Sequence, residues 1–135
     1  MFPVSQGDAL KVLVVDDDPR AVDLITARLQ GLATTVLKAY GGREAIDVAR
    51  TELPGLIVLD LMMPETSGFE VVEQLNMRPD TARIPILVVT AKRVTAADRS
   101  RLKGYVMTIM EKAEFDNDRF LTEVRRAVSS RKETA

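Results

Sequence analysis

Cysteine and histidine are both absent from the 135 residues of this chain. Without cysteine the chain has neither a disulfide framework nor a thiolate zinc site. Without histidine it cannot support Ser-His-Asp, Cys-His or HExxH chemistry, and it cannot relay a phosphoryl group through a histidine of its own. Any nucleophile, base or metal ligand must therefore be a carboxylate, a hydroxyl or an amine.

An excess of one charge and a long apolar run are also missing. The chain has 19 Lys and Arg against 20 Asp and Glu, a balance that argues against a nucleic-acid surface based on bulk positive charge. Its longest charge-free apolar runs have about four residues, whereas a membrane-spanning helix needs about 20. The first ten residues lack the basic start and apolar core of a signal peptide. We therefore expect a soluble, cytoplasmic protein that binds neither nucleic acid nor a membrane.

Length and composition predict one compact domain. Apolar residues make up 46% of the chain and charged residues 29%, which is enough for a core and a charged exterior. We expect the domain to cover residues 10–129, with an N-terminal tail at 1–9 and a C-terminal tail at 130–135.

Short apolar runs alternate with amphipathic stretches along the chain. Buried strands are predicted at 11–15, 34–39, 56–59, 84–89 and 105–110. Helices are predicted at 19–30, 42–51, 68–75, 95–103 and 116–129, the first with Asp18 as N-cap and Pro19 at its first position. Strands that alternate with helices predict an α/β fold, a doubly wound, five-stranded parallel sheet with helices on both faces.

Polar side chains gather where these strands end, the edge at which such sheets bind ligands. They are Asp16, Asp17 and Asp18 after the first strand, Asp60 after the third, Thr90, Ala91 and Lys92 after the fourth, and Glu111 and Lys112 after the fifth. Two carboxylates about 5 Å apart repel by roughly 3 kcal/mol at an effective dielectric of 20, so the cluster must hold protons or a cation. Carboxylate oxygens suit Mg²⁺ or Mn²⁺. We interpret Asp18 as a helix cap and Lys92 as a solvated charge.

Three stretches carry a specific spacing of these residues: VLVVDDDPR, LIVLDLMMPETSGFE and IPILVVTAK. An acid pair follows the first strand. Pro64 comes four residues after Asp60 (64 − 60), and Gly68 four residues after Pro64 (68 − 64). Lys112 comes 22 residues after Thr90 (112 − 90). In this order the stretches resemble the receiver domain of two-component response regulators, the family of CheY, over residues 10–129. The resemblance implies the flavodoxin-like strand order 2-1-3-4-5.

The resemblance implies a phosphoryl site centred on Asp60. Asp60 would accept the phosphoryl group, Lys112 would pair with it, and the Thr90 hydroxyl and the Ala91 amide would donate hydrogen bonds to its oxygens. The physics agrees, because a carboxylate that attacks a phosphoryl group needs nearby cations and donors in line.

The resemblance also implies a Mg²⁺ site, with Mn²⁺ as a possible substitute. Asp17 and Asp60 would bind the ion directly, Asp16 would bind it through water, and the backbone carbonyl of Met62 would complete the protein ligands.

The implied function is a signalling switch rather than a turnover enzyme, although it would assist its own phosphotransfer and dephosphorylation. The partner would be a histidine kinase or a histidine phosphotransfer protein, and the output would act through protein contact. The ending MEKAEFDNDRFLTEVRRAV is similar to receivers attached to hybrid histidine kinases.

The sequence departs from the family pattern near the fifth strand. Ala113 follows Lys112 where the family usually has a cis proline, so we expect a trans bond. Ile109 replaces the aromatic switch residue of many receivers, and Tyr105 is too distant to substitute for it. The helix at 95–103 is short and polar, which predicts a remodelled dimerisation face.

Two other interpretations stay open. A pseudo-receiver would keep the fold without being phosphorylated, a hypothesis that the missing proline and aromatic residue support. A haloacid-dehalogenase-type phosphatase would use Asp16 as nucleophile in an Asp16-x-Asp18 motif, but Arg20 stands where that motif has threonine.

Overall fold

Strands and helices alternate along the chain in the computed structural model, which describes residues 10–134. The predicted tail at 1–9 lies outside the described residues. The elements in chain order are β1 Lys11–Val15, α2 Pro19–Arg28, β2 Thr35–Ala39, α3 Gly42–Glu52, β3 Leu56–Leu59, α4 Gly68–Asn76, α5 Pro79–Ala82, β4 Ile86–Thr90, α6 Ala96–Leu102, β5 Thr108–Glu111, the 3-10 helix η1 Lys112–Glu114 and α7 Asn117–Thr134.

The five strands form one parallel sheet in the order β2-β1-β3-β4-β5. This confirms the predicted fold class and strand order. In the register, Val15 pairs with Leu59 and Thr90 pairs with Glu111. The carboxyl ends of the strands are thus level, and the residues that follow them meet at one edge of the sheet.

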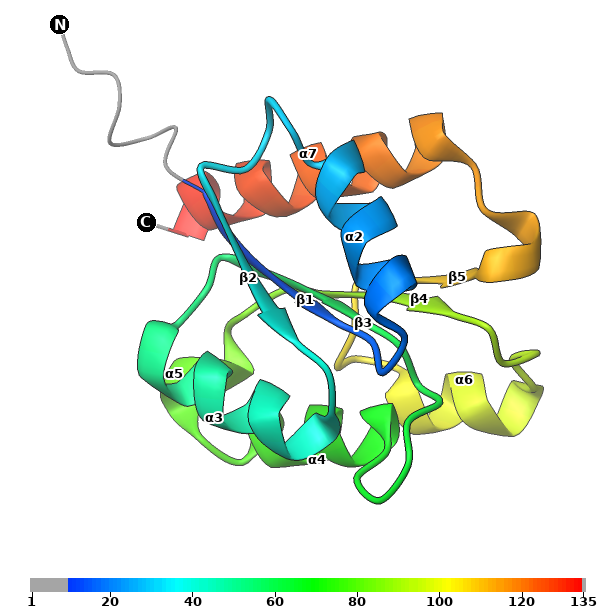
Figure 1. Ribbon diagram of the computed structural model, residues 1–135. Helices are drawn as coiled ribbons and strands as arrows, with labels where there is room; N and C mark the ends of the chain where they lie inside the picture. Colours follow the sequence, from blue (N-terminus) through cyan, green and yellow to red (C-terminus); the bar gives the residue numbers. More distant parts are fainter. Residues whose placement is uncertain (1–9, 135) are drawn as a thin grey trace, which may run out of the picture.

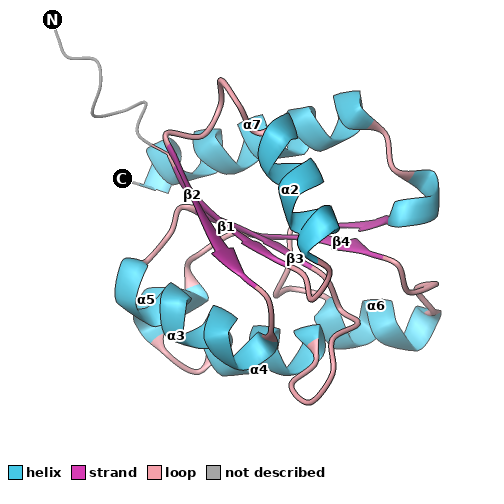
Figure 2. Ribbon diagram, in the orientation of Figure 1, coloured by secondary structure: helices cyan, strands magenta, loops and turns pink. Residues whose placement is uncertain are grey.

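Helices cover both faces of the sheet, with α2 and α7 on one side and α3, α4, α5 and α6 on the other (Figures 1 and 2). Each face has its own apolar core cluster. Every residue of β3 and β4 is buried, because both faces of these central strands are covered. This is why the two strands are unbroken apolar runs in the sequence.

Side-chain caps fix where the helices begin. The Asp18 carboxylate accepts a hydrogen bond from the Arg20 amide at 3.0 Å, which confirms its interpretation as a helix cap. A capping box formed by Ser67 and Glu70 starts α4, and α6 starts with the same arrangement at Thr95. Such caps contribute about 1 kcal/mol each.

Most elements agree with the predicted bounds to within two residues, and three differ by more. Strand β5 begins at Thr108 rather than at 105, because the Tyr105 amide still donates to the carbonyl of Leu102 at the end of α6. The short helix α5 was not predicted. Helix α7 continues to Thr134, so the chain is helical in most of the segment that we expected to form a C-terminal tail.

The peptide bond after Lys112 agrees with the expectation from the sequence. No peptide bond among residues 10–134 is cis, as expected for Lys112–Ala113, and the chain continues there as η1. Within those same residues we find no helix whose length and hydropathy would let it cross a bilayer.

Candidate functional site

Three carboxylates from two neighbouring strands meet at the carboxyl edge of the sheet. Asp16 and Asp17 follow β1, Asp60 follows β3, and each offers an oxygen within 4.8 Å of the others. Asp16 and Asp60 are buried, whereas Asp17 is exposed. The sequence-based prediction that these residues form one cluster is confirmed. An all-carboxylate donor set with one open side suits a hard divalent cation that retains several waters.

Asp60 is the most enclosed carboxylate of the cluster, at 3% exposure. Its Oδ1 accepts hydrogen bonds from the Thr90 hydroxyl at 2.6 Å and from the Met62 amide at 3.1 Å. Burial raises the pKa of Asp60 and the charge of Asp16 adds to the rise, while the two hydrogen bonds and Lys112 oppose it.

Lys112 provides the cation that faces these acids. Its Nζ lies 2.6 Å from Oδ2 of Asp16 and 3.9 Å from Oδ2 of Asp60. The lysine comes from the first residue of η1, directly after β5. Residues 96 apart in the chain are thereby paired at the site, and an anionic group beside Asp60 would find this ammonium within reach.

Thr90 links the Asp60 carboxylate to the loop after β4. Besides donating to Asp60, its hydroxyl oxygen lies 3.2 Å from the Lys92 amide and 3.4 Å from the Leu61 amide. Thr90 is fully buried, whereas Ala91 is exposed at the open side of the site. Thr90 is the last residue of β4 and Ala91 follows it, so both lie at the carboxyl edge of the sheet.

The loop between β3 and α4 forms the wall beside Asp60. The Met62 side chain is 53% exposed, while its amide is held by Asp60 as described above. Gly68 starts α4 so close to the end of β3 that a Cβ there would overlap the carbonyl oxygen of Asp60. The Gly68 amide also donates to the Leu61 carbonyl at 3.1 Å, which closes the loop.

The structure corrects the interpretation of Lys92. Its Nζ forms an ion pair with Asp98 at 3.0 Å, and the two side chains are only 32% and 16% exposed. It is therefore a structural contact between the loop and α6 rather than a solvated charge. The spacing of six residues between Lys92 and Asp98 (98 − 92) gave no sign of this pair, because it bridges a loop and a helix.

Glu111 is a residue whose role sequence reasoning missed. Its Oε2 accepts a hydrogen bond from the Val94 amide at 2.8 Å. Glu111 was noted only as a charge at the strand end. Its position directly before Lys112 was the available signal, but a backbone partner cannot be identified from sequence.

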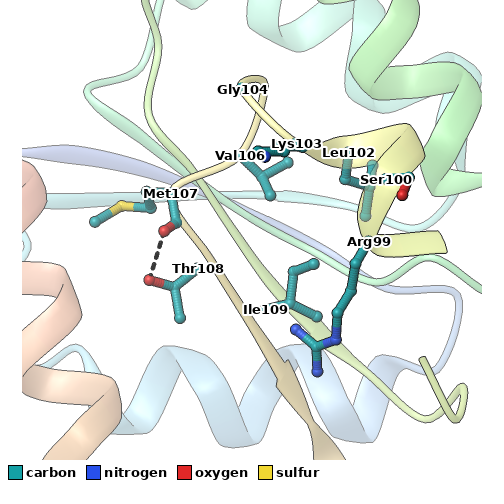
Figure 3. A pocket seen from close by; sticks show the side chains of 9 residues that line it. All are labelled: Arg99, Ser100, Leu102, Lys103, Gly104, Val106, Met107, Thr108 and Ile109. Carbon is teal, nitrogen blue, oxygen red and sulfur yellow. Dashed lines mark hydrogen bonds between the residues drawn. The ribbon is translucent and has the colours of Figure 1, made fainter. Parts of the chain in front are cut away.

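A hollow lies between α6 and β5 beside Ile109. It has a volume of about 350 Å³ and is lined by Ile109, Leu102 and Val106 together with other residues of α6, β5 and the segment that joins them. Figure 3 shows the side chain of Arg99, from α6, reaching down beside Ile109. An aliphatic residue thus occupies the strand position at which the resemblance leads one to expect an aromatic ring.

The chain is similar in sequence to response regulators. Residues 12–125 match the family model of the response regulator receiver domain. Protein PilH of Pseudomonas aeruginosa is 37% identical over 82 residues, which are 61% of this chain and 68% of that protein. The alkaline phosphatase synthesis transcriptional regulatory protein PhoP of Bacillus subtilis is 45% identical over 82 residues, again 61% of this chain but only 33% of PhoP.

Solved structures show the same fold. The chemotaxis protein CheY4 of Vibrio cholerae superposes with a TM-score of 0.78 at 28% identity, covering 88% of this chain and 98% of that chain. The match to PhoP spans about a third of that regulator's length. The similarity therefore concerns the receiver portion, and the remaining part of such regulators has no counterpart in the alignment.

Proposed function

Because this chain belongs to the receiver-domain family of response regulators, we propose that it is a phospho-acceptor switch centred on Asp60. Receiver domains are signalling modules of two-component systems. The observation that supports the assignment most strongly is the setting of Asp60, a buried carboxylate held by the Thr90 hydroxyl and faced by the Lys112 ammonium.

The phosphoryl donor is a phosphohistidine on a histidine kinase or a histidine phosphotransfer protein. The chain has no histidine, so the donor must come from another molecule or another segment. A carboxylate oxygen of Asp60 attacks phosphorus, the new P–O bond forms as the P–N bond breaks, and the leaving imidazole takes a proton. Lys112 pairs with the transferred group, and the Thr90 hydroxyl and the Ala91 amide donate to its oxygens.

The donor set fits Mg²⁺ or Mn²⁺ at the same edge. Asp17 and Asp60 would hold the ion directly, Asp16 through a water molecule, and the Met62 backbone carbonyl would complete the protein ligands. When bound, the ion supplies charge stabilisation for the transferring phosphoryl group. The clustering of three carboxylates within 4.8 Å supports this assignment.

The output acts through contact with another protein in the cytoplasm, without turnover of a substrate and without nucleic-acid binding by this domain. The acyl phosphate biases the neighbouring surface, and partners read the change. The balance of charges, 19 basic against 20 acidic residues, supports protein contact over nucleic-acid binding. The C-terminal stretch is similar to receivers attached to hybrid histidine kinases, so attachment to such a kinase is one arrangement that fits this domain.

Intact-mass analysis after incubation with acetyl phosphate and Mg²⁺ tests the proposal. We expect the wild-type protein to gain a phosphate only when the metal is present, Asp60→Ala to gain none, and the control Asp47→Ala, an exposed change on α3, to behave as wild type. Incorporation that persists in Asp60→Ala but disappears in Asp16→Asn would instead favour the dehalogenase-type phosphatase. A wild-type protein that is not phosphorylated and binds neither Mg²⁺ nor beryllofluoride would favour the pseudo-receiver.

A further inference from the structure

Glu111 ties the end of β5 to the loop that follows β4. Its Oε2 accepts a hydrogen bond from the Val94 amide at 2.8 Å. Glu111 is also the register partner of Thr90 across the β4–β5 ladder. One residue of β5 therefore lies beside the start of the loop and holds the backbone near its end.

The groups that would meet a phosphoryl oxygen lie at the start of this loop and on the residue before it. That residue is Thr90, whose hydroxyl donates to Asp60 at 2.6 Å and lies 3.2 Å from the Lys92 amide. The Ala91 amide lies between those two residues, so its direction depends on the path of the loop. Thr90 is fixed at the end of β4, and Val94 is fixed by its hydrogen bond to Glu111. The backbone between these two residues therefore has fewer paths available.

A second contact anchors the same loop from the other side. Lys92 pairs with Asp98 of α6 at 3.0 Å, and Asp98 also accepts from the Thr95 amide at 2.9 Å. These contacts join the loop to α6, whereas Glu111 alone joins it to β5 among the hydrogen bonds seen in residues 10–134. The strand that leads into Lys112 thus also holds the loop that follows Thr90.

The geometry points to Glu111 as a positioning residue for the phosphoryl group, acting through the β4–α6 loop. This inference rests on the proposed function, because it concerns the donors that would bind the group on Asp60. Glu111 makes no contact with Asp60 itself. By holding the Val94 amide it orders the loop in advance, so that the Thr90 hydroxyl and the Ala91 amide need less rearrangement to bind a phosphoryl oxygen.

Simple electrostatics predicts the opposite effect of removing this residue. Glu111 is an acid next to a site for an anion, so loss of its charge alone should strengthen anion binding. Loss of the hydrogen bond should weaken anion binding, because the loop must then be ordered when the anion binds. The sign of the change therefore distinguishes positioning from a plain charge effect.

The experiment compares Mg²⁺ binding by calorimetry with beryllofluoride binding by ¹⁹F NMR at saturating Mg²⁺. For Glu111→Ala we expect beryllofluoride affinity about three- to tenfold weaker, the loss of one hydrogen bond, with Mg²⁺ affinity unchanged because the loop supplies none of the metal ligands. Glu111→Gln keeps an acceptor oxygen and should restore most of the affinity. Glu114→Ala removes an exposed acid three residues further along (114 − 111) and should not weaken binding.

The outcomes separate this inference from the proposed function. A wild-type protein that binds no beryllofluoride would contradict the proposed function. A wild-type protein that binds it, with Glu111→Ala equal or tighter, would overturn the positioning role alone. Equal weakening of Mg²⁺ and beryllofluoride binding in Glu111→Ala would show general damage to the site and would overturn it as well.

Discussion

Asp60 is a buried carboxylate whose negative charge the fold disfavours. Burial raises its pKa from the usual 3.8, and the neighbouring charge of Asp16 acts in the same direction. The folded protein therefore holds this proton more tightly than the unfolded chain does. Ionised Asp60 costs the fold stability at pH values above its raised pKa, and the cost is relieved as the pH falls through that pKa.

Asp60→Asn should consequently raise the free energy of unfolding in EDTA at pH 7. Asparagine keeps a carbonyl oxygen for the hydrogen bonds from Thr90 and Met62 but carries no charge. Urea unfolding of both proteins between pH 7 and pH 4 provides the measurement, and the advantage of the variant should shrink as the pH falls. The control Asp47→Asn, at an exposed position, should change stability by less than about 0.5 kcal/mol.

Added Mg²⁺ should reverse this order. A ligand that binds only the folded state stabilises it by about 1.4 kcal/mol at ten times its dissociation constant, and Asp60→Asn removes a proposed ligand. An Asp60→Asn variant that is less stable than wild type in EDTA would contradict the charge argument.

Lys112 should contribute more to stability than an exposed lysine does. Its ion pair with Asp16 involves a carboxylate that is only 7% exposed, whereas the pair between Lys11 and Glu52 is 40% and 42% exposed. Removing Lys112, whose own side chain is 33% exposed, leaves the buried Asp16 charge uncompensated and costs up to about 3 kcal/mol, while an exposed pair contributes less than about 1 kcal/mol. Chemical unfolding in EDTA should therefore show a large loss for Lys112→Ala and a small one for Lys11→Ala; equal losses would refute the argument.

At this scale, sequence reasoning located the acidic residues and Lys112 but not their supporting contacts. Strand ends in a parallel sheet always meet at one edge, so Asp16, Asp60 and Lys112 could be brought together from order alone. Glu111 and Lys92 instead act on a backbone amide and on a helix residue. Such partners depend on the path of a loop, which apolar periodicity does not encode.

On the scale of the elements, the loop between β3 and α4 is tightly constrained. A Cβ at Gly68 would overlap backbone atoms of Asp60 and Leu61, and backbone cannot move aside as a flexible side chain can. Earlier along the same loop, Glu65 has a φ of 67°, a conformation that is unfavourable for a residue other than glycine. Within this loop the Met62 amide donates to Asp60 at 3.1 Å.

Gly68→Ala should therefore weaken Mg²⁺ binding as well as stability, because the displaced loop carries both Asp60 and Met62. Gly104→Ala is the matched control: it has a φ of 88° and open space around it, so it should cost about 1 kcal/mol in stability and leave the metal site intact. Calorimetric titration of Mg²⁺ into both variants is the measurement. Unchanged affinity in Gly68→Ala would show that the loop adjusts without disturbing the ligands.

Sequence patterns predicted β1 and β3 residue for residue but missed the start of β5 and the whole of α5. Strands β3 and β4 are buried on both faces, so uninterrupted apolar runs mark them. Strand β5 lies at the edge of the sheet and begins only after the turn at Gly104, where φ is 88°. Helix α5 has four residues and buries only Thr81, too few for a periodic signal.

On the scale of the whole molecule, one sheet joins two separate apolar clusters. One cluster packs under α3, α4 and α6, and the other under α2 and α7. Side chains alternate between the faces along each strand, so neither cluster can be exposed without disrupting strands that the other needs. We therefore expect a single cooperative unfolding transition.

Val71 of α4 and Val124 of α7 allow a matched test, since both are fully buried and they lie in opposite clusters. Each substitution by alanine should lower the free energy of unfolding by about 2 kcal/mol. The two tyrosines, in a chain without tryptophan, lie at opposite edges of the sheet, because Tyr40 follows β2 and Tyr105 precedes β5. In urea, tyrosine fluorescence from Tyr40→Phe and Tyr105→Phe backgrounds should shift together with circular dichroism in both valine variants. Separate transitions at the two edges, or a fluorescence transition that departs from circular dichroism in either variant, would mean that the domain unfolds in more than one step.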